Sequence, residues 1–183
     1  GRYPAFWIGV NFLAATGLKA SSILAELEAR GVRINAYWAD DARIDESTVI
    51  QEEADTIAAT RAACGWQGLY FGGTAFKKQR PVDPKDYAHA AVIAGGFMDV
   101  VTTSGIATGQ SADLGKLADF RTALPDQPIA LASGITPENA TDYEMADCFM
   151  VATGINFEND FYNIDPARLS RLVNVCDEMG KRS

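Results

Sequence analysis

The sequence has little of the residues that metal centres and catalytic triads require. It contains one histidine, His89, and three cysteines, Cys64, Cys148 and Cys176, among 183 residues. Since zinc sites and Ser-His-Asp triads need histidines or paired cysteines, the sequence excludes a His-rich metal centre and argues against a triad. His89 falls within an expected helix, which indicates a structural role. The cysteines have apolar neighbours, which favours reduced packing residues in a cytoplasmic protein.

Other absences restrict the class of protein further. No apolar run reaches the ~18–20 residues that span a bilayer, so no transmembrane segment is expected, and no signal peptide is evident. The formal net charge is −8, and Lys77, Lys78 and Arg80 form the one basic cluster, which argues against a nucleic-acid partner. Neither a P-loop nor a G-x-G-x-x-G motif is present. The chain begins Gly-Arg-Tyr rather than with Met, which leaves its natural start open.

What is present is a regular alternation of apolar strands and helices. Strands are expected over 5–13, 32–38, 68–73, 98–104, 129–133 and 148–153. Helices are expected over 18–30, 47–63 (with Ser47 as N-cap), 86–94, 112–123, from Pro137, and 166–179. Short, continuously apolar strands indicate a parallel sheet that is covered on both faces. Residues 1–183 therefore form one α/β domain of six βα units, either a barrel-type or an open doubly wound sheet.

Small or amide residues follow the expected strands: Asn11, Asn35, Gly72-Gly73, Ser104-Gly105, Ser133-Gly134 and Thr153-Gly154. Ligands of parallel α/β folds bind at the carboxyl ends of strands, and glycine allows a backbone N–H to approach an anion closely. The last two turns are thus expected to hold a phosphate through the N–H groups of Gly134, Ile135, Gly154 and Ile155. The further phosphate-binding candidates are Ser104, Gly105, Thr108, Gly109 and Ser133. Asn11, Asn35 and Ser104 would orient the rest of the substrate. The alternative is that the Ser-Gly and Thr-Gly pairs only form ordinary turns between strands and helices.

Charged side chains supply further candidates. Lys77 and Lys78 follow a strand and could contact a phosphate or form a Schiff base, or could be solvated loop lysines. Asp40, Asp41 and Asp45 follow another strand, and such carboxylates act as a general base, bind Mg²⁺, or are simply solvated. We name Asp40 and Lys77 as candidate catalytic residues together with Asn11 and Asn35. No cofactor is evident, and nothing in the sequence supports Mg²⁺ beyond this possibility.

Several segments together resemble one known family. They are "IGVNFL", "VRINAYWADDARIDE", "DVVTTSGIATGQSADLGKL", "ASGITPENATDY" and "NIDPARLSRLV". They are similar to segments of the BtpA/SgcQ family, phosphate-binding-type TIM barrels named for a photosystem I biogenesis protein. The resemblance implies a (β/α)₈-type barrel with a polar pocket and a phosphate site. The matching positions are Asn11, Asn35, Ser104, Gly105, Thr108, Gly109, Ser133, Gly134, Asn139 and Asp165.

The chain departs from the family pattern in places. Lys77-Lys78 replaces Lys-His, Gly72-Gly73 replaces an aspartate position, and Ala152-Thr153 replaces Gly-Thr, with Phe157 in place of a lysine. A full barrel needs ~250 residues. The family begins with two βα units that have no counterpart here, so the resemblance implies that the six units correspond to the third through eighth. We therefore expect a second copy to complete the barrel, as a homo-oligomer, or closure with six strands. The expected function is binding of a phosphorylated small molecule by an enzyme of unassigned reaction; the alternative is a non-catalytic assembly factor.

Overall fold

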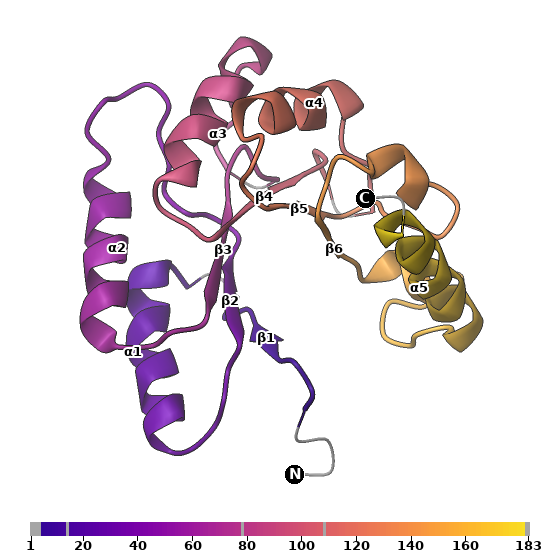
Figure 1. The fold of residues 1–183 in the computed structure, drawn as a ribbon, viewed down its shortest axis with the longest axis horizontal. Coiled ribbons are helices and arrows are strands. Elements are labelled where there is room, and N and C mark those ends of the chain that lie inside the picture. Colours follow the sequence, from indigo (N-terminus) through magenta and orange to yellow (C-terminus); the bar gives the residue numbers. More distant parts are fainter. Residues whose placement is uncertain (1–4, 14, 78, 108, 182–183) are drawn as a thin grey trace.

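The sheet has six parallel strands in the order of the sequence, as a computed structural model of residues 5–13, 15–77, 79–107 and 109–181 shows. The strands are β1 (Gly9–Val10), β2 (Ala36–Ala39), β3 (Leu69–Gly73), β4 (Val100–Ser104), β5 (Ile129–Ala132) and β6 (Cys148–Met150). Figure 1 shows that they curl into an arc. A doubly wound sheet reverses its strand order at a switch point, and this sheet does not. The barrel-type prediction is confirmed, as an incomplete barrel.

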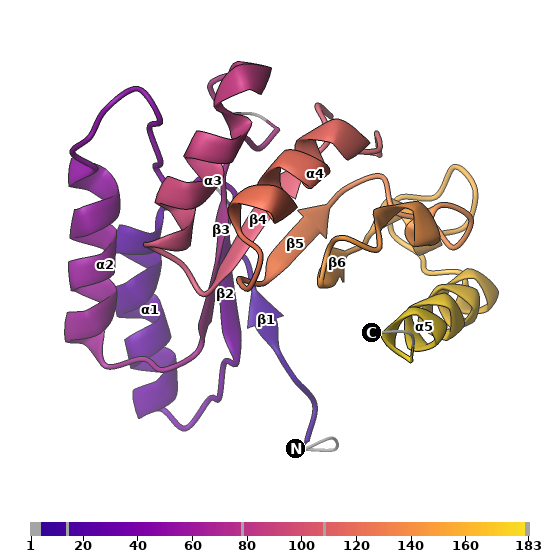
Figure 2. The same cartoon turned by 45° about the horizontal axis from the view of Figure 1, so that its top comes forward.

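The helices lie on the convex side of the arc (Figure 2). They are α1 (Gly17–Ala29), α2 (Glu52–Cys64), α3 (Tyr87–Gly95), α4 (Leu114–Ala123) and α5 (Pro166–Gly180), with 3₁₀ turns η1 (Pro84–Asp86), η2 (Ala140–Tyr143) and η3 (Thr153–Ile155). Asp165 caps α5 by accepting from two backbone N–H groups. Two expectations are wrong. Ser47 bonds to Asp45 in a turn that precedes α2, and the helix expected from Pro137 is a turn followed by η2.

Alternating side chains divide the core into two layers. Val101, Leu117 and Leu131 pack between the sheet and the helices, in the larger cluster. Val100 and Phe71 belong to a smaller cluster with Ala36 and Ala130 on the concave face. Successive strand residues point to opposite faces, so this division follows from strand geometry. The concave face is therefore the interior of the incomplete barrel.

A polar residue immediately precedes β2, β4 and β6, and its side chain accepts a hydrogen bond from a backbone N–H of the strand segment before it. The three pairs are Asn35 with Ile8 at 3.0 Å, Asp99 with Tyr70 at 2.7 Å, and Asp147 with Ile129 at 2.8 Å. The same contact thus recurs once in every two strands, at the amino ends of the strands.

This recurring contact corrects the prediction for Asn35. The residue lies before β2, at the opposite end of the sheet from the expected ligand site, because β2 begins only at Ala36. Arginines reinforce the two acidic examples: Arg61 of α2 pairs with Asp99, and Arg121 of α4 pairs with Asp147. Asn35 therefore joins strands, and does not face a substrate.

The sheet ends at β1 on one side and at β6 on the other. Within the described ranges, each of these strands pairs with one neighbour, β2 and β5 respectively. Their outer backbone groups are therefore available to a further strand. Among these same residues, no helix is both long enough and apolar enough to cross a membrane.

Candidate functional site

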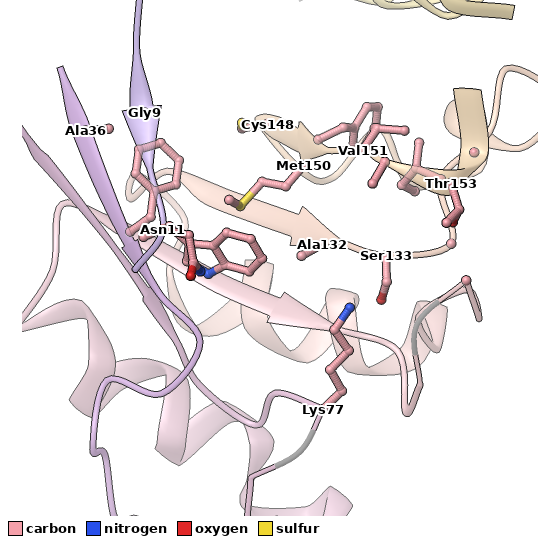
Figure 3. A pocket seen from close by; sticks show the side chains of 18 of the residues that line it. Gly9, Asn11, Ala36, Lys77, Ala132, Ser133, Cys148, Met150, Val151 and Thr153 are labelled. Carbon is pink, nitrogen blue, oxygen red and sulfur yellow. The ribbon is translucent and has the colours of Figure 1, made fainter. Parts of the chain in front are cut away.

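A cavity of about 490 Å³ occupies the concave face of the sheet (Figure 3). Trp7, Trp38, Phe71 and Met150 form its apolar part. The polar side chains that line it include Asn11, Lys77, Ser133 and Thr153, which follow strand ends or lie in the turns beyond them. The cavity thus joins the apolar barrel interior to a polar rim, where parallel α/β proteins bind ligands.

The cavity brings together seven of the predicted catalytic and phosphate-binding residues: Asn11, Lys77, Gly109, Ser133, Gly134, Ile135 and Gly154. Five others do not line it, namely Asn35, Asp40, Ser104, Gly105 and Ile155. Thr108 lies outside the described residues. The turns after β5 and β6 do meet at one cavity, as the pattern of Ser-Gly and Thr-Gly turns predicts.

Lys77 is the one charged side chain among the described residues that line the cavity. Figure 3 shows it extending toward the part of the cavity where Ser133 lies. Its backbone N–H donates to the Ser104 hydroxyl at 2.8 Å, and that hydroxyl donates to the Gly105 carbonyl at 2.8 Å. These two bonds use the Ser104 hydroxyl, and Ser104 does not line the cavity, so this hydroxyl positions the Lys77 backbone and does not reach a ligand, contrary to expectation.

Lys116 is a residue that sequence reasoning missed. Its ammonium group donates to the backbone carbonyls of Ala75 and Ser104, and lies 5.3 Å from the Tyr87 ring centre. Burial lowers the pKa of Lys116 to about 8, although Asp113 opposes this shift. Lys116 thereby ties the Lys77 segment to the end of β4. The available signal was its place four residues before buried Phe120, on one helix face.

The turns require glycine because the neighbouring backbone leaves no room for a side chain. A Cβ on Gly134, whose φ is +75°, would lie 2.4 Å from the Cα of Ser111. A Cβ on Gly154 would lie 1.8 Å from the carbonyl oxygen of Ile135. The Gly134 carbonyl also accepts from the Asn139 side chain at 2.8 Å. The turns after β4, β5 and β6 therefore nest against one another, and this packing alone requires small residues.

One of the four expected N–H donors is already used. The N–H of Ile155 donates to the Ala152 carbonyl at 3.2 Å within η3, and Ile155 itself is buried in the core. The prediction that Ile155 donates to an anion is therefore wrong. Gly134, Ile135 and Gly154 remain at the cavity wall.

Ser133 has an unusual backbone and an unusual side chain. Its φ is +78°, a left-handed conformation that residues other than glycine adopt infrequently. Its hydroxyl oxygen is buried and has no hydrogen-bond partner within the described part of the chain, although Ser133 lines the cavity. Strained backbone and unsatisfied buried polar atoms concentrate at functional sites, so Ser133 makes the polar rim a candidate site.

Asp40 acts on the cavity through Asn11. The Asn11 amide donates to the Asp40 carboxylate at 3.0 Å, which fixes the orientation of the side chain that lines the cavity. The neighbouring acids are held by protein groups: Asp45 bonds to Ser47 and pairs with Arg80 at 3.2 Å, and hydrogen bonds from Ser47 lower the pKa of Asp45. Among the described residues, no three His, Cys, Asp or Glu side chains gather as a metal-binding group.

Comparison with known proteins places this geometry in context. The model of the BtpA family matches residues 5–178. An uncharacterized protein from Thermococcus kodakarensis is 26% identical over 178 residues, which are 96% of this chain and 67% of the archaeal protein.

Solved structures are similar in fold. A mandelate racemase/muconate lactonizing protein from Herpetosiphon aurantiacus superposes with a TM-score of 0.58 at 9% identity, over 96% of this chain and 45% of that protein. This chain thus spans less than half of that relative. Phosphoribosyl anthranilate isomerase from Thermus thermophilus gives a TM-score of 0.48 at 14% identity, over 95% of this chain and all of the isomerase. At 9% identity, the likeness to the racemase-type protein shows a common fold alone.

Proposed function

Because the chain belongs to the BtpA family, whose model covers residues 5–178, we propose that it binds a phosphorylated small molecule at the polar rim of its cavity. One observation carries the proposal: Lys77 and the glycine-bearing turns at Gly109, Gly134 and Gly154 line the same cavity. Phosphate oxygens accept hydrogen bonds from backbone N–H groups that glycine leaves accessible, and a lysine ammonium neutralises their charge.

Each residue of the rim has a part in this proposal. Lys77 supplies the positive charge, and its place depends on Ser104 and on Lys116, which hold the Lys77 segment against β4. The unpartnered Ser133 hydroxyl donates to a phosphate oxygen. Asn11, fixed by Asp40, contacts the part of the molecule beyond the phosphate. We propose further that the bound molecule is a substrate, whose turnover would be sought among phosphate monoesters.

The test is binding of inorganic phosphate, measured by calorimetry and by thermal melting, with sodium chloride at equal ionic strength as the salt control. Lys77→Met keeps the apolar stem and removes the charge, and it is expected to weaken phosphate binding by roughly tenfold or more, since hydrogen bonds to charged groups contribute about 1.5–3 kcal/mol. Lys85→Met is the matched control, because Lys85 is exposed and pairs with Asp83 at 3.2 Å. Equal phosphate affinity in the two variants would contradict the proposal.

A further inference from the structure

The apolar part of the cavity carries aromatic rings. Trp7, Trp38 and Phe71 all line it, and the rings of Trp7 and Phe71 meet edge to face with centres 6.4 Å apart. Trp7 remains 53% exposed, so this ring is partly open to a ligand. Flat aromatic walls offer large apolar contact area to another ring, and ligand pockets commonly combine such walls with a few polar groups.

Trp38 contributes a hydrogen-bond donor that lacks an acceptor. Its indole Nε1 atom is buried and has no hydrogen-bond partner among the residues that the structure describes. The corresponding atom of Trp66, on the opposite side of the sheet, donates to the Ile34 carbonyl at 3.1 Å. Buried indole N–H groups usually find an acceptor, so the unpartnered group at the cavity wall points to an acceptor that a ligand brings.

The indole and the proposed phosphate contact are close enough for one small molecule. The ring centre of Phe76 lies 5.8 Å from that of Trp38 and 5.6 Å from the Lys77 ammonium nitrogen. Trp38 and Lys77 both line the same cavity of about 490 Å³, a volume typical of sites for drug-sized ligands. A molecule held by its phosphate at Lys77 can therefore place its remaining atoms against Trp38.

We propose that the ligand is a phosphate monoester whose other part is a flat aromatic or heteroaromatic ring, and that this part carries a hydrogen-bond acceptor for the Trp38 indole N–H. This inference rests on the proposed function, since it takes the phosphate end of the cavity as given. It adds the chemical class of the remainder: an aromatic acceptor in place of a polyhydroxylated sugar or glycerol chain.

The experiment compares four probes by calorimetry: inorganic phosphate, glycerol 3-phosphate, phenyl phosphate and 4-nitrophenyl phosphate, whose nitro group accepts hydrogen bonds. Both aryl phosphates are expected to bind at least about tenfold more tightly than glycerol 3-phosphate, because burying a ring against apolar walls stabilises the complex in proportion to the apolar area removed from water. 4-Nitrophenyl phosphate is expected to bind most tightly.

Trp38→Phe tests the indole itself, because it keeps a ring and removes the donor. It is expected to lower the affinity for 4-nitrophenyl phosphate roughly three- to tenfold more than the affinity for phenyl phosphate, as for one hydrogen bond, and to leave the affinity for inorganic phosphate unchanged. Trp66→Phe is the control, with unchanged preference among the probes. Melting curves establish that each variant is folded at the titration temperature.

The possible failures are distinguishable. If inorganic phosphate and glycerol 3-phosphate bind while the aryl esters bind no more tightly, the inference is overturned and the proposed function stands. An equal loss of affinity for all four probes in Trp38→Phe also overturns it, since the indole then supports the fold of the site. If no phosphate compound binds, both proposals fall.

Discussion

The carbonyl oxygen of Ile135 lies 1.8 Å from the point where a Cβ atom on Gly154 would stand. The turns after β5 and β6 are therefore in backbone contact, and no side chain fits at position 154 of the cavity wall. A substitution of Gly154 is therefore expected to change the stability of the fold, whatever its effect on binding.

Gly154→Ala is expected to lower the free energy of unfolding by more than about 3 kcal/mol, because two rigid backbones must separate. The measurement is urea unfolding followed by circular dichroism. Gly180→Ala is the matched control: none of the described residues lies within 4 Å of its Cβ position at the end of α5, and a change within about 1 kcal/mol is expected. Wild-type stability in Gly154→Ala would show that the turns are not nested.

The residues before the even-numbered strands are expected to serve stability alone. Asp99→Ala leaves the Tyr70 N–H without its acceptor and Arg61 without its partner, so the free energy of unfolding should fall by about 2 kcal/mol or more. Phosphate affinity should not change, because Asp99 lies at the amino ends of the strands. Asp126→Ala, at an exposed position, is the control and should be neutral. A selective loss of phosphate binding in Asp99→Ala would refute this separation.

Ser133, which lines the cavity, and Ser104, which lies behind it, should respond in opposite ways. Ser133→Ala removes a buried hydroxyl that has no partner, so stability should be unchanged or rise by up to about 1 kcal/mol while phosphate affinity falls severalfold. Ser104→Ala removes a hydroxyl that bonds to Lys77 and to Gly105, so stability should fall by about 1–2 kcal/mol. Unfolding curves and phosphate titrations of the two variants check this pair. Full phosphate affinity in Ser133→Ala would remove Ser133 from the site.

Lys116 should make stability depend on pH above neutrality. Its pKa is about 8 in the folded protein and returns to its ordinary 10.5 on unfolding. Between these values the unfolded chain binds more protons, so the free energy of unfolding rises with pH through this window, by at most about 3 kcal/mol at 1.36 kcal/mol per pKa unit. Below pH 8 the charged form is present in both states, and the slope vanishes.

The measurement is chemical unfolding of the wild type and of Lys116→Met between pH 7 and 9.5, a range that stops short of ordinary tyrosine titration. The difference between the two proteins isolates the contribution of Lys116, since other groups titrate alike in both. Parallel pH profiles of wild type and variant would show that Lys116 keeps an ordinary pKa.

The unpaired edges at β1 and β6 predict self-association. Each edge offers backbone donors and acceptors, and the apolar concave face lies between them, so a second copy is expected to cover this region. Light scattering after size-exclusion chromatography should give a mass above the 19.7 kDa of one chain at micromolar concentration. A folded monomer that shows no association over a wide concentration range would contradict this expectation.

The sequence by itself determined the family, the order of the six strands and the helices other than the one expected from Pro137. Continuous apolar runs separated by helices predict parallel strands, because local hydrophobic pattern reports which faces are covered. The glycine-bearing turns also predicted that the segments after β5 and β6 meet at one cavity, where Gly134 and Gly154 do lie. Their role in binding phosphate stays a prediction.

The tertiary structure decided which groups remain available to a ligand. Asn35 lies just before β2, at the amino ends of the strands. The Ser104 hydroxyl accepts a hydrogen bond from the Lys77 N–H, and the Ile155 N–H donates within η3. Lys116 reaches the Ala75 carbonyl across 41 residues of sequence. Strand register and contacts between distant segments fix these partners, and neither is encoded in the local pattern of apolar and polar residues.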